Sequence, residues 1–339
     1  MNVITVMGID LAKNIFHIHA VGKHGKPVLR KKLRRNEVMG CLSNIAPCLV
    51  GVEACGGSNY WVRKIEELGH TVKMMPPQYV KPYVKTNKND LNDAEAICEA
   101  VQRPNMHFVP KKSVDQQDIQ MTHRIRQRMI TARTALVNEA RGLLAEYGII
   151  MGKGIGQFSK SIVEIIDDEK NGLTPFGRRR MSGLWEELSD MQKRIASLDD
   201  EVASIYKNSD VCKRLGKVPG VGPITATAMV AAVSDAGVFK NGRQMSAWIG
   251  LVPKQHSTGG KSRLLGISKR GDVYLRTLLI HGGRSVVLAA KNKTDKYSQW
   301  VTQKAMTRGK NKAAVAVANK NARILWKLLS SGECYKAAA

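Results

Sequence analysis

A short basic stretch at residues 254–276 combines two hydroxyl side chains with a pair of glycines. It reads KQHSTGGKSRLLGISKRGDVYLR, so that Ser257 and Thr258 directly precede the glycines. Glycine lets the backbone approach a bulky anion closely, and cationic side chains bind phosphate oxygens. A hydroxyl in this setting is a candidate nucleophile toward a phosphodiester, although a phosphate-binding loop with a bystander serine would have the same composition. The basic members are Lys254, Lys261, Arg263, Lys269, Arg270 and Arg276.

Acidic side chains end two apolar segments in the first part of the chain. Asp10 ends VITVMGID at residues 3–10, and Glu53 lies near the end of CLVGVEA at residues 48–54. Central parallel strands are buried on both faces and read as nearly continuous apolar runs. We therefore expect the two segments to be neighbouring strands, with their carboxylates about 5 Å apart. Either acid alone could equally be a helix cap or a loop residue.

Two further acids begin a predicted helix. The segment KNDLNDAEAICE at residues 88–99 places Asp90 and Asp93 three residues apart, on one helix face. Acids in a first turn commonly stabilise a helix, which would account for one of them. Four carboxylates around one point repel each other unless a cation offsets their charge, and oxygen ligands favour Mg²⁺ or Mn²⁺. Such a site suits phosphodiester cleavage.

These carboxylates require an α/β domain to hold them. Three consecutive strands, then alternating helices and strands, describe an RNase H-like (RuvC-like) sheet, which we assign to a domain at residues 1–150. The expected strands are 3–10, 15–21, 27–34, 48–54 and 71–75, and the expected helices between the last three of them are about 37–45 and 59–68.

The rest of the chain is predicted to be mainly α-helical. A long helix at residues 114–147 carries arginines that either face solvent or follow phosphates. Apolar residues spaced 4-3-4-3 within 176–206 predict a coiled-coil arm, assigned to 151–209. The segment LGKVPGVGPITATAMVAAV resembles a helix-hairpin-helix, in which Gly220 and Gly222 would offer backbone N–H groups to phosphate. With the hydroxyl stretch and later helices at about 273–290 and 312–329, it forms a third predicted domain, 210–335.

Bulk composition indicates the class of partner. A formal net charge of +26 implies a polyanion, which for a folded chain of 339 residues points to nucleic acid. Six cysteines without zinc-ligand spacing are expected to be free thiols in a reducing compartment. No signal peptide or membrane-length apolar run is evident, so we expect a cytoplasmic, nucleoid-associated protein without a membrane partner.

The order of these motifs resembles the DEDD transposases of the one-ten family of insertion sequences, most closely its eleven-eleven branch. The matching motifs are GIDLAK, VEACGG, KNDLNDAEAI, PGVGPITA and AWIGLVPKQHSTGGKSRLLGISKRGDVYLR. The resemblance implies a RuvC-like domain with Asp10, Glu53, Asp90 and Asp93 as catalytic metal ligands, a coiled-coil insertion and a transposase domain with an essential serine. It also implies a homo-oligomer, a dimer or tetramer, that recombines donor and target DNA under a structured noncoding guide RNA. The serine would form a phosphoserine link during strand exchange.

One position departs from the family pattern. Members often carry the serine directly before the glycine, where this chain has Thr258. We predict Ser257 as the nucleophile and keep Thr258 as the alternative; the six basic residues, Thr258, Gly220 and Gly222 are the predicted nucleic-acid ligands. Two other functions stay open. One is a RuvC-type Holliday-junction resolvase or nuclease that uses only metal-activated water, and the other is an architectural nucleic-acid-binding protein.

Overall fold

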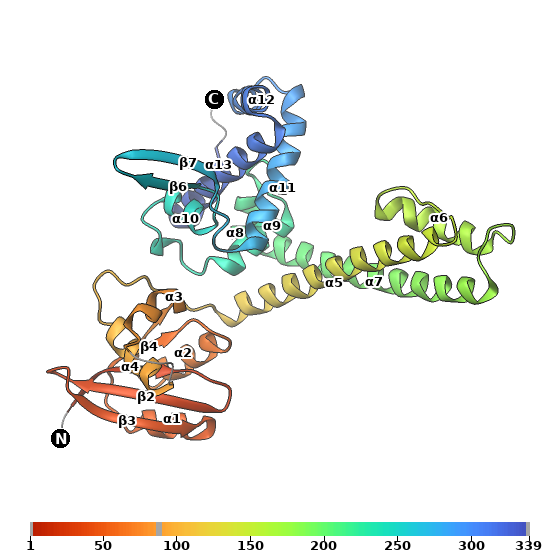
Figure 1. The fold of residues 1–339 in the computed structure, drawn as a ribbon. Coiled ribbons are helices and arrows are strands. Elements are labelled where there is room, and N and C mark those ends of the chain that lie inside the picture. Colours follow the sequence, from red (N-terminus) through yellow and green to blue (C-terminus); the bar gives the residue numbers. More distant parts are fainter. Residues whose placement is uncertain (1–2, 86–89, 337–339) are drawn as a thin grey trace. The chain divides into compact units, whose positions relative to one another are not determined.

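The structure, a computed structural model, describes residues 3–85 and 90–336 and divides into two compact units (Figure 1). The first unit comprises the chain up to Val114 together with residues 234–240, and the second comprises 115–233 and the chain from Asn241 onward. The long helix expected at 114–147 thus belongs to the second unit. The division into three functional domains stays a prediction.

A five-stranded sheet organises the first unit, in the order β3-β2-β1-β4-β5. Its first three strands form an antiparallel meander, whereas β1 pairs in parallel with β4, and β4 with β5. The predicted meander and the side-by-side placement of the first and fourth strands are confirmed, and the mixed sheet is compatible with an RNase H-like fold. The strands are β1 (Ile4–Asp10), β2 (Ile15–Gly22), β3 (Pro27–Arg34), β4 (Leu49–Glu53) and β5 (Thr71–Met75).

Helices cover both faces of this sheet. The helices α1 (Val38–Ser43) and α2 (Ser58–Glu66) bury residues such as Leu42 and Trp61 against one face. The short helix α3 (Pro77–Val80) and the longer α4 (Asp90–Ala100) pack on the other face, where Ile97 and Val101 are buried. The helix expected from residue 88 is therefore present from Asp90; residues 88 and 89 lie outside the described part of the chain.

Glycines let α4 come close to the sheet. Gly8 of β1 and Gly51 of β4 are register partners. A Cβ atom added to Gly8 would lie 2.2 Å from the carbonyl oxygen of Ala94, and one added to Gly51 would lie 2.8 Å from Cβ of Val101. Any larger residue at Gly8 would push the backbone of α4 away. This pair of glycines therefore sets how closely α4 packs against β1 and β4.

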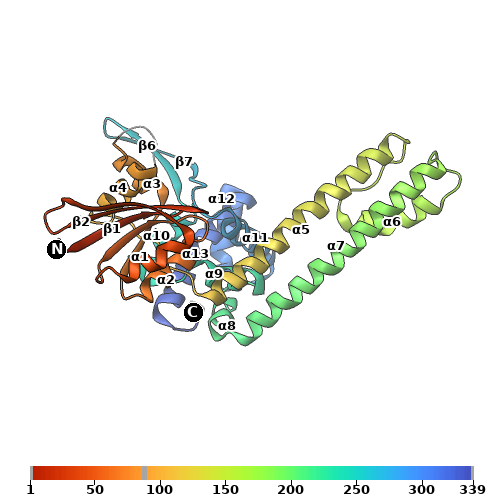
Figure 2. The same ribbon diagram turned by 90° about the horizontal axis from the view of Figure 1, so that it is seen from below.

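The second unit is largely helical. The long helices α5 (Val114–Ala145) and α7 (Pro175–Asn208) lie side by side, with α6 (Ile155–Asp167) between them in sequence (Figures 1 and 2). Leu188, Ile195 and Val202, three residues of the predicted heptad, are buried. The helix is confirmed, and its assignment as a coiled coil stays a prediction. The remaining elements are α8 (Asp210–Gly216), α9 (Pro223–Ala232), α10 (Gly242–Trp248), β6 (Pro253–Thr258), β7 (Lys261–Ile267), α11 (Val273–Ala289), α12 (Lys296–Arg308) and α13 (Lys310–Ser331).

One local expectation in this unit is corrected, and some helices were not expected. The hydroxyl stretch is not a loop but a β-hairpin of β6 and β7. Helices α6, α10 and α12 were not among the elements that the sequence predicted. No helix in the described ranges has the length and apolar character needed to cross a bilayer.

Candidate active site

Three of the four predicted acids converge in the first unit. Asp10 ends β1, and Asp90 and Asp93 lie in the first turn of α4. One carboxylate oxygen of each lies within 4.8 Å of those of the other two, a spacing that suits a shared cation. Asp10 and Asp93 are half-buried, and Asp90 is exposed. Oxygen donors of this kind fit Mg²⁺ or Mn²⁺, so the residues present match the metal that was expected.

Glu53 lies beside this group at the end of β4. Burial raises the pKa of its carboxyl group, and the negative charges of Asp10 and Asp93 raise that pKa further. Among the described residues, the set whose ligand oxygens lie within 4.8 Å of one another does not include Glu53. The strand register explains its position, because Ile9 pairs with Val52 and both strands end one residue later.

Two buried histidines border the carboxylates, and sequence reasoning missed both. His17 is the register partner of Asp10, and its Nδ1 lies 3.8 Å from a carboxylate oxygen of Asp90. His19 follows two residues later, with Nδ1 3.9 Å from Glu95, and burial lowers its pKa. The alternation in IFHIHAVG was the available signal, since residues two apart share one face of a strand.

The predicted nucleophile lies in the second unit, on the hairpin. Ser257 is exposed, and the side-chain amide of Gln255 donates a hydrogen bond of 2.7 Å to its Oγ. Gly259 and Gly260 form the turn with φ of 55° and 75°, as a two-residue type I′ turn requires. Ser257 pairs with Ser262, and Thr258 pairs with Lys261.

The two candidate hydroxyls, those of Ser257 and Thr258, lie on opposite faces of the hairpin. Successive residues of a strand point to opposite sides of the sheet. Ser257 therefore shares a face with Gln255 and Ser262, whereas Thr258 shares the other face with Lys261 and Arg263. All of these side chains are exposed. Moving the serine by one residue along the strand would therefore place its hydroxyl on the other face of the hairpin.

Most of the predicted phosphate ligands are available on the surface. Lys254, Lys261 and Arg263 are exposed on the hairpin, and Lys269 and Arg270 are exposed in the segment that follows it. Lys269 has a left-handed backbone with φ of 56°.

Arg276 differs from the expectation, because its side chain is only 7% exposed. Its Nη1 donates to the carbonyl oxygens of Ile249 at 2.9 Å and Arg270 at 2.8 Å. These bonds satisfy a buried charge and tie the segment after the hairpin to α10 and α11. Arg276 therefore has a structural position rather than that of a surface phosphate ligand.

The two turn glycines of the predicted helix-hairpin-helix occupy different environments. Gly220 has φ of 80°, and a Cβ atom there would lie 2.6 Å from the carbonyl oxygen of Gly282 in α11. Gly222 is exposed at the N-cap of α9, where backbone N–H groups lack intrahelical partners. Close packing against α11 therefore explains why residue 220 is a glycine. A contact with phosphate stays a prediction for Gly222.

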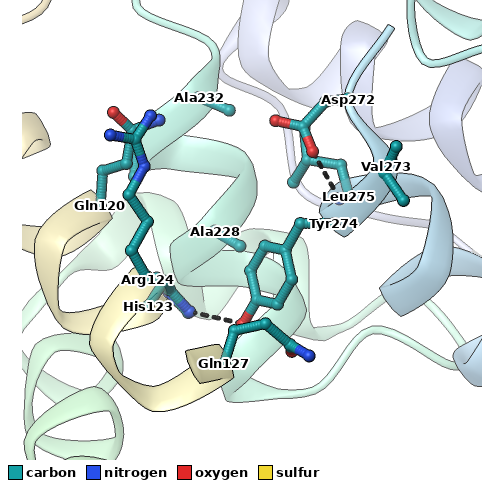
Figure 3. Close-up of a pocket in the computed structure, with 11 residues that line it drawn as sticks. Gln120, His123, Arg124, Gln127, Ala228, Ala232, Asp272, Val273, Tyr274 and Leu275 are labelled. Atoms are coloured by element: carbon teal, nitrogen blue, oxygen red, sulfur yellow. Dashed lines mark hydrogen bonds between the residues drawn. The ribbon is translucent and has the colours of Figure 1, made fainter. Parts of the chain in front are cut away.

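A pocket of about 360 Å³ lies between α5, α9 and α11 of the second unit, and Figure 3 shows it. On its wall, His123 is 3% exposed and lies 2.9 Å from both the hydroxyl of Tyr274 and Oγ1 of Thr227. The Thr227 hydroxyl donates to the carbonyl of Pro223 at 2.8 Å. It therefore accepts from Nε2–H of His123, which leaves Nδ1 to accept from Tyr274.

Burial keeps His123 neutral, because it lowers the pKa of the imidazole to about 4. Three helices far apart in sequence are joined through this one side chain. Nothing in the local sequence THRIR of α5 distinguished it from the arginines beside it.

Two parts of the chain match known transposase families. Residues 7–149 match a family described as a transposase, the DEDD transposases of the IS110 type. Residues 212–299 match the transposase IS116/IS110/IS902 family.

Full-length relatives agree with these matches. A probable family 20 transposase of Pseudomonas aeruginosa is 49% identical over 332 residues, which cover 97% of this chain and 98% of that protein. The transposase for insertion sequence element IS1111A of Coxiella burnetii is 44% identical, covering 100% of this chain and 93% of that protein. The transposase for element IS1328 of Yersinia enterocolitica is 38% identical, with 98% of each chain covered. Because such identity extends over nearly the whole length, this chain belongs to the IS110 family of insertion-sequence transposases, enzymes that cut and rejoin DNA.

Proposed function

We propose that this transposase is an RNA-guided DNA recombinase that uses an acidic metal site and the Ser257 hydroxyl in turn. The convergence of Asp10, Asp90 and Asp93 from distant parts of the chain carries the proposal, because three carboxylate oxygens within 4.8 Å of one another can bind one cation together. These three residues would hold Mg²⁺ or Mn²⁺, with Glu53 beside them. The cation, when bound, supplies positive charge to stabilise phosphate oxygens during strand cleavage.

In the proposed reaction, Ser257 makes the covalent link to DNA. Its Oγ attacks a backbone phosphorus, the bond from phosphorus to one bridging oxygen breaks, and that oxygen leaves with a proton. The phosphoserine bond is then attacked by the hydroxyl of the strand being joined, which restores Ser257. The exposed position of Ser257 supports this role, because a DNA strand can reach it. Lys254, Lys261, Arg263, Lys269 and Arg270 would bind phosphates elsewhere along the same strand.

The guide RNA and the oligomer come from the family resemblance. A net charge of +26 supports a large polyanionic partner, and both RNA and DNA satisfy that description. The proposal includes a dimer or tetramer in which acidic sites and serines meet on DNA. Sequencing RNA that copurifies with the full-length protein, and measuring the mass of the complex with and without ribonuclease, test both parts.

A covalent adduct is the decisive test of the serine. Full-length protein is incubated with RNA, Mg²⁺ and a nicked DNA substrate that traps cleaved strands, and denaturing gels show protein linked to DNA. We expect the adduct to map to Ser257 by mass spectrometry and to be absent from Ser257→Ala. Ser262→Ala, which removes the hydroxyl opposite, is the matched control and should retain it. Cleavage without any adduct would instead support the resolvase or nuclease, in which water is the nucleophile.

The metal site is tested separately. Asp90→Asn removes a negative charge from an exposed residue of the cluster and should abolish cleavage. Wild-type cleavage should stop in EDTA and return with Mg²⁺ or Mn²⁺. Full activity of Asp90→Asn would overturn the acidic site and favour an architectural DNA-binding role for the first unit.

A further inference from the structure

A groove of about 670 Å³ lies in the first unit, at the same sheet edge as the carboxylates. β3 runs in the same direction as β1, because each is antiparallel to β2 between them. Asp10 at the end of β1 and Arg34 at the end of β3 therefore lie at one edge of the sheet. Asp10 pairs with His17, and Arg34 pairs with Ile15, two residues earlier on β2. With strands about 4.8 Å apart and residues about 3.4 Å apart along a strand, the Cα atoms of Asp10 and Arg34 lie roughly 12 Å apart. Met39, Tyr60 and Trp61 line the groove from the face that α1 and α2 cover, whereas α4 carries Asp90 and Asp93 on the other face.

Arginine and aromatic side chains line this groove. The guanidinium of Arg35 lies 5.0 Å from the ring centroid of Trp61 and 6.0 Å from that of Tyr60. Trp61 is buried at 4% exposure and packs edge-on against Phe16 at 4.8 Å, so that it forms a fixed floor. Tyr60 is 45% exposed and meets Trp61 edge-on at 5.4 Å. The partly exposed ring of Tyr60 is thus accessible to a ligand, beside the guanidinium group of Arg35.

Backbone contacts fix Arg35 relative to the active site. Its backbone N–H donates to the carbonyl of Asn14 at 2.9 Å, and its Nη1 donates to the carbonyl of Lys13 at 3.4 Å. Lys13 and Asn14 belong to the segment that connects Asp10 to β2. A movement of this connection would shift Arg35 and Asp10 together.

The charge of the groove is positive and largely uncompensated. The ion pairs between described residues include neither Arg34 nor Arg35. The neighbouring acid, Glu37, accepts a hydrogen bond of 2.6 Å from the backbone N–H of Arg34. Both arginines are exposed residues, and they lie beside the partly exposed side chain of Tyr60. This combination matches the phosphate and the flat base of a nucleotide.

We propose that the groove lined by Arg34, Arg35 and Tyr60 binds an unpaired nucleotide of the DNA strand that lies across the carboxylates. Arg34 and Arg35 bind its phosphate, and its base stacks on Tyr60. The base must be unpaired, because stacking on a side chain requires a ring face that a duplex keeps inside. This inference rests on the proposed cleavage at the acidic site, from which the strand would pass the ends of β1 and β3 to reach the groove. It gives the transposase a subsite that holds the strand beside the bond being cut.

Photocrosslinking tests the contact without requiring activity. Full-length protein is irradiated in EDTA with single-stranded DNA that carries 5-iodouracil, and crosslinked peptides are mapped by mass spectrometry. We expect a crosslink at Tyr60 that Tyr60→Phe retains and Tyr60→Ala loses. Crosslinks that all lie outside the groove would overturn the proposal. The same crosslink is expected in Ser257→Ala and Asp90→Asn, so that failure of the proposed chemistry and failure of the subsite are distinguishable.

Affinity measurements test the charge. We expect Arg35→Ala to weaken single-stranded DNA binding by about 5- to 100-fold and to lower the salt dependence by about one phosphate contact. Lys23→Ala removes a charge from an exposed residue in the turn at the opposite edge of the same sheet, and it is the matched control. An equal loss in both variants would show a general charge effect and overturn the subsite.

Two further measurements distinguish phosphate binding from a loss of packing, and DNA binding from RNA binding. Arg35→Ala could loosen the packing on Trp61, so Arg35→Lys, which keeps the charge, is measured beside it. A smaller loss for Arg35→Lys, with unchanged thermal unfolding, supports phosphate binding; wild-type affinity in both variants overturns it. Single-stranded RNA of the same sequence is the competing ligand. Tighter binding of RNA than DNA, lost in Arg35→Ala, would overturn the assignment to a DNA strand.

Discussion

Ser257 lies directly opposite Ser262 in the antiparallel ladder of β6 and β7. The relationship fixes which face of the hairpin carries the predicted nucleophile. Gln255 lies on the same face and donates to Ser257 Oγ at 2.7 Å and to Ser262 Oγ at 3.4 Å. The basic side chains of Lys261 and Arg263 lie on the other face, with Thr258. A DNA backbone held by these two cations would therefore have to pass around the hairpin to reach Ser257.

The hairpin register predicts that a serine at position 258 cannot replace Ser257 as the nucleophile. In the double variant Ser257→Ala, Thr258→Ser, the remaining serine lies on the opposite face, so we expect no adduct with DNA. The single variant Thr258→Ser should form the adduct at the wild-type position. Denaturing gels followed by peptide mapping check both. An adduct at residue 258 in the double variant would contradict this prediction.

The close approach of α4 predicts that a methyl group at Gly8 disturbs the acidic site. Gly8→Ala places a Cβ atom against the backbone of α4 and should cost about 1–3 kcal/mol of unfolding free energy. Because α4 carries Asp90 and Asp93, we also expect weaker Mn²⁺ binding in titration calorimetry.

Gly40→Ala is the control for this substitution. It lies in α1, where an added Cβ would meet nothing within 4 Å. Alanine is a better helix former than glycine, so stability should be retained or raised, and Mn²⁺ binding should be unchanged. Wild-type Mn²⁺ affinity in Gly8→Ala would show that the helix can shift without moving the aspartates.

Burial of His123 predicts a loss of stability in mild acid. Its pKa is about 4 in the folded protein, whereas an unperturbed histidine titrates near 6.5. The neutral form is favoured by folding, so this contribution is fully present above pH 6.5 and is lost as the pH falls toward 4. Between pH 7 and pH 5 the loss amounts to about 2 kcal/mol.

Urea unfolding at several pH values checks this effect. His123→Gln should lower stability at pH 7, because the hydrogen bonds to Tyr274 and Thr227 are altered, and it should reduce the difference between pH 7 and pH 5. His281→Gln, at an exposed position on α11, should leave the wild-type pH dependence intact. An unchanged pH dependence in His123→Gln would rule out the neutral buried imidazole.

Arg276 and Arg263 should respond differently to substitution. Arg276→Met leaves the carbonyl groups of Ile249 and Arg270 without their donor, and we expect a loss of about 1.5–3 kcal/mol in unfolding free energy. Arg263→Met removes an exposed charge, so its thermal unfolding should stay at the wild-type temperature while DNA affinity falls. Calorimetry and a DNA-binding assay on both variants separate the two roles. Equal stability of the two proteins would refute the structural role of Arg276.

Local sequence patterns predicted the five strands and the approach of Asp10, Asp90 and Asp93. Apolar runs that end in Asp10 and Glu53 predicted neighbouring buried strands, and the spacing of Asp90 and Asp93 placed both on one helix face. These features depend on the alternation and periodicity of residues close together in the chain, which the sequence displays directly.

Features that depend on residues distant in sequence became visible only in the folded chain. The paired glycines Gly8 and Gly51 set how closely α4 packs on the sheet. The hairpin register places Ser257 and Thr258 on opposite faces. Arg276 reads as one more cation in a basic stretch, yet its hydrogen bonds to Ile249 and Arg270 make it part of the interior. A side chain's role is set by its partners in space, and close packing brings together partners that no local pattern encodes.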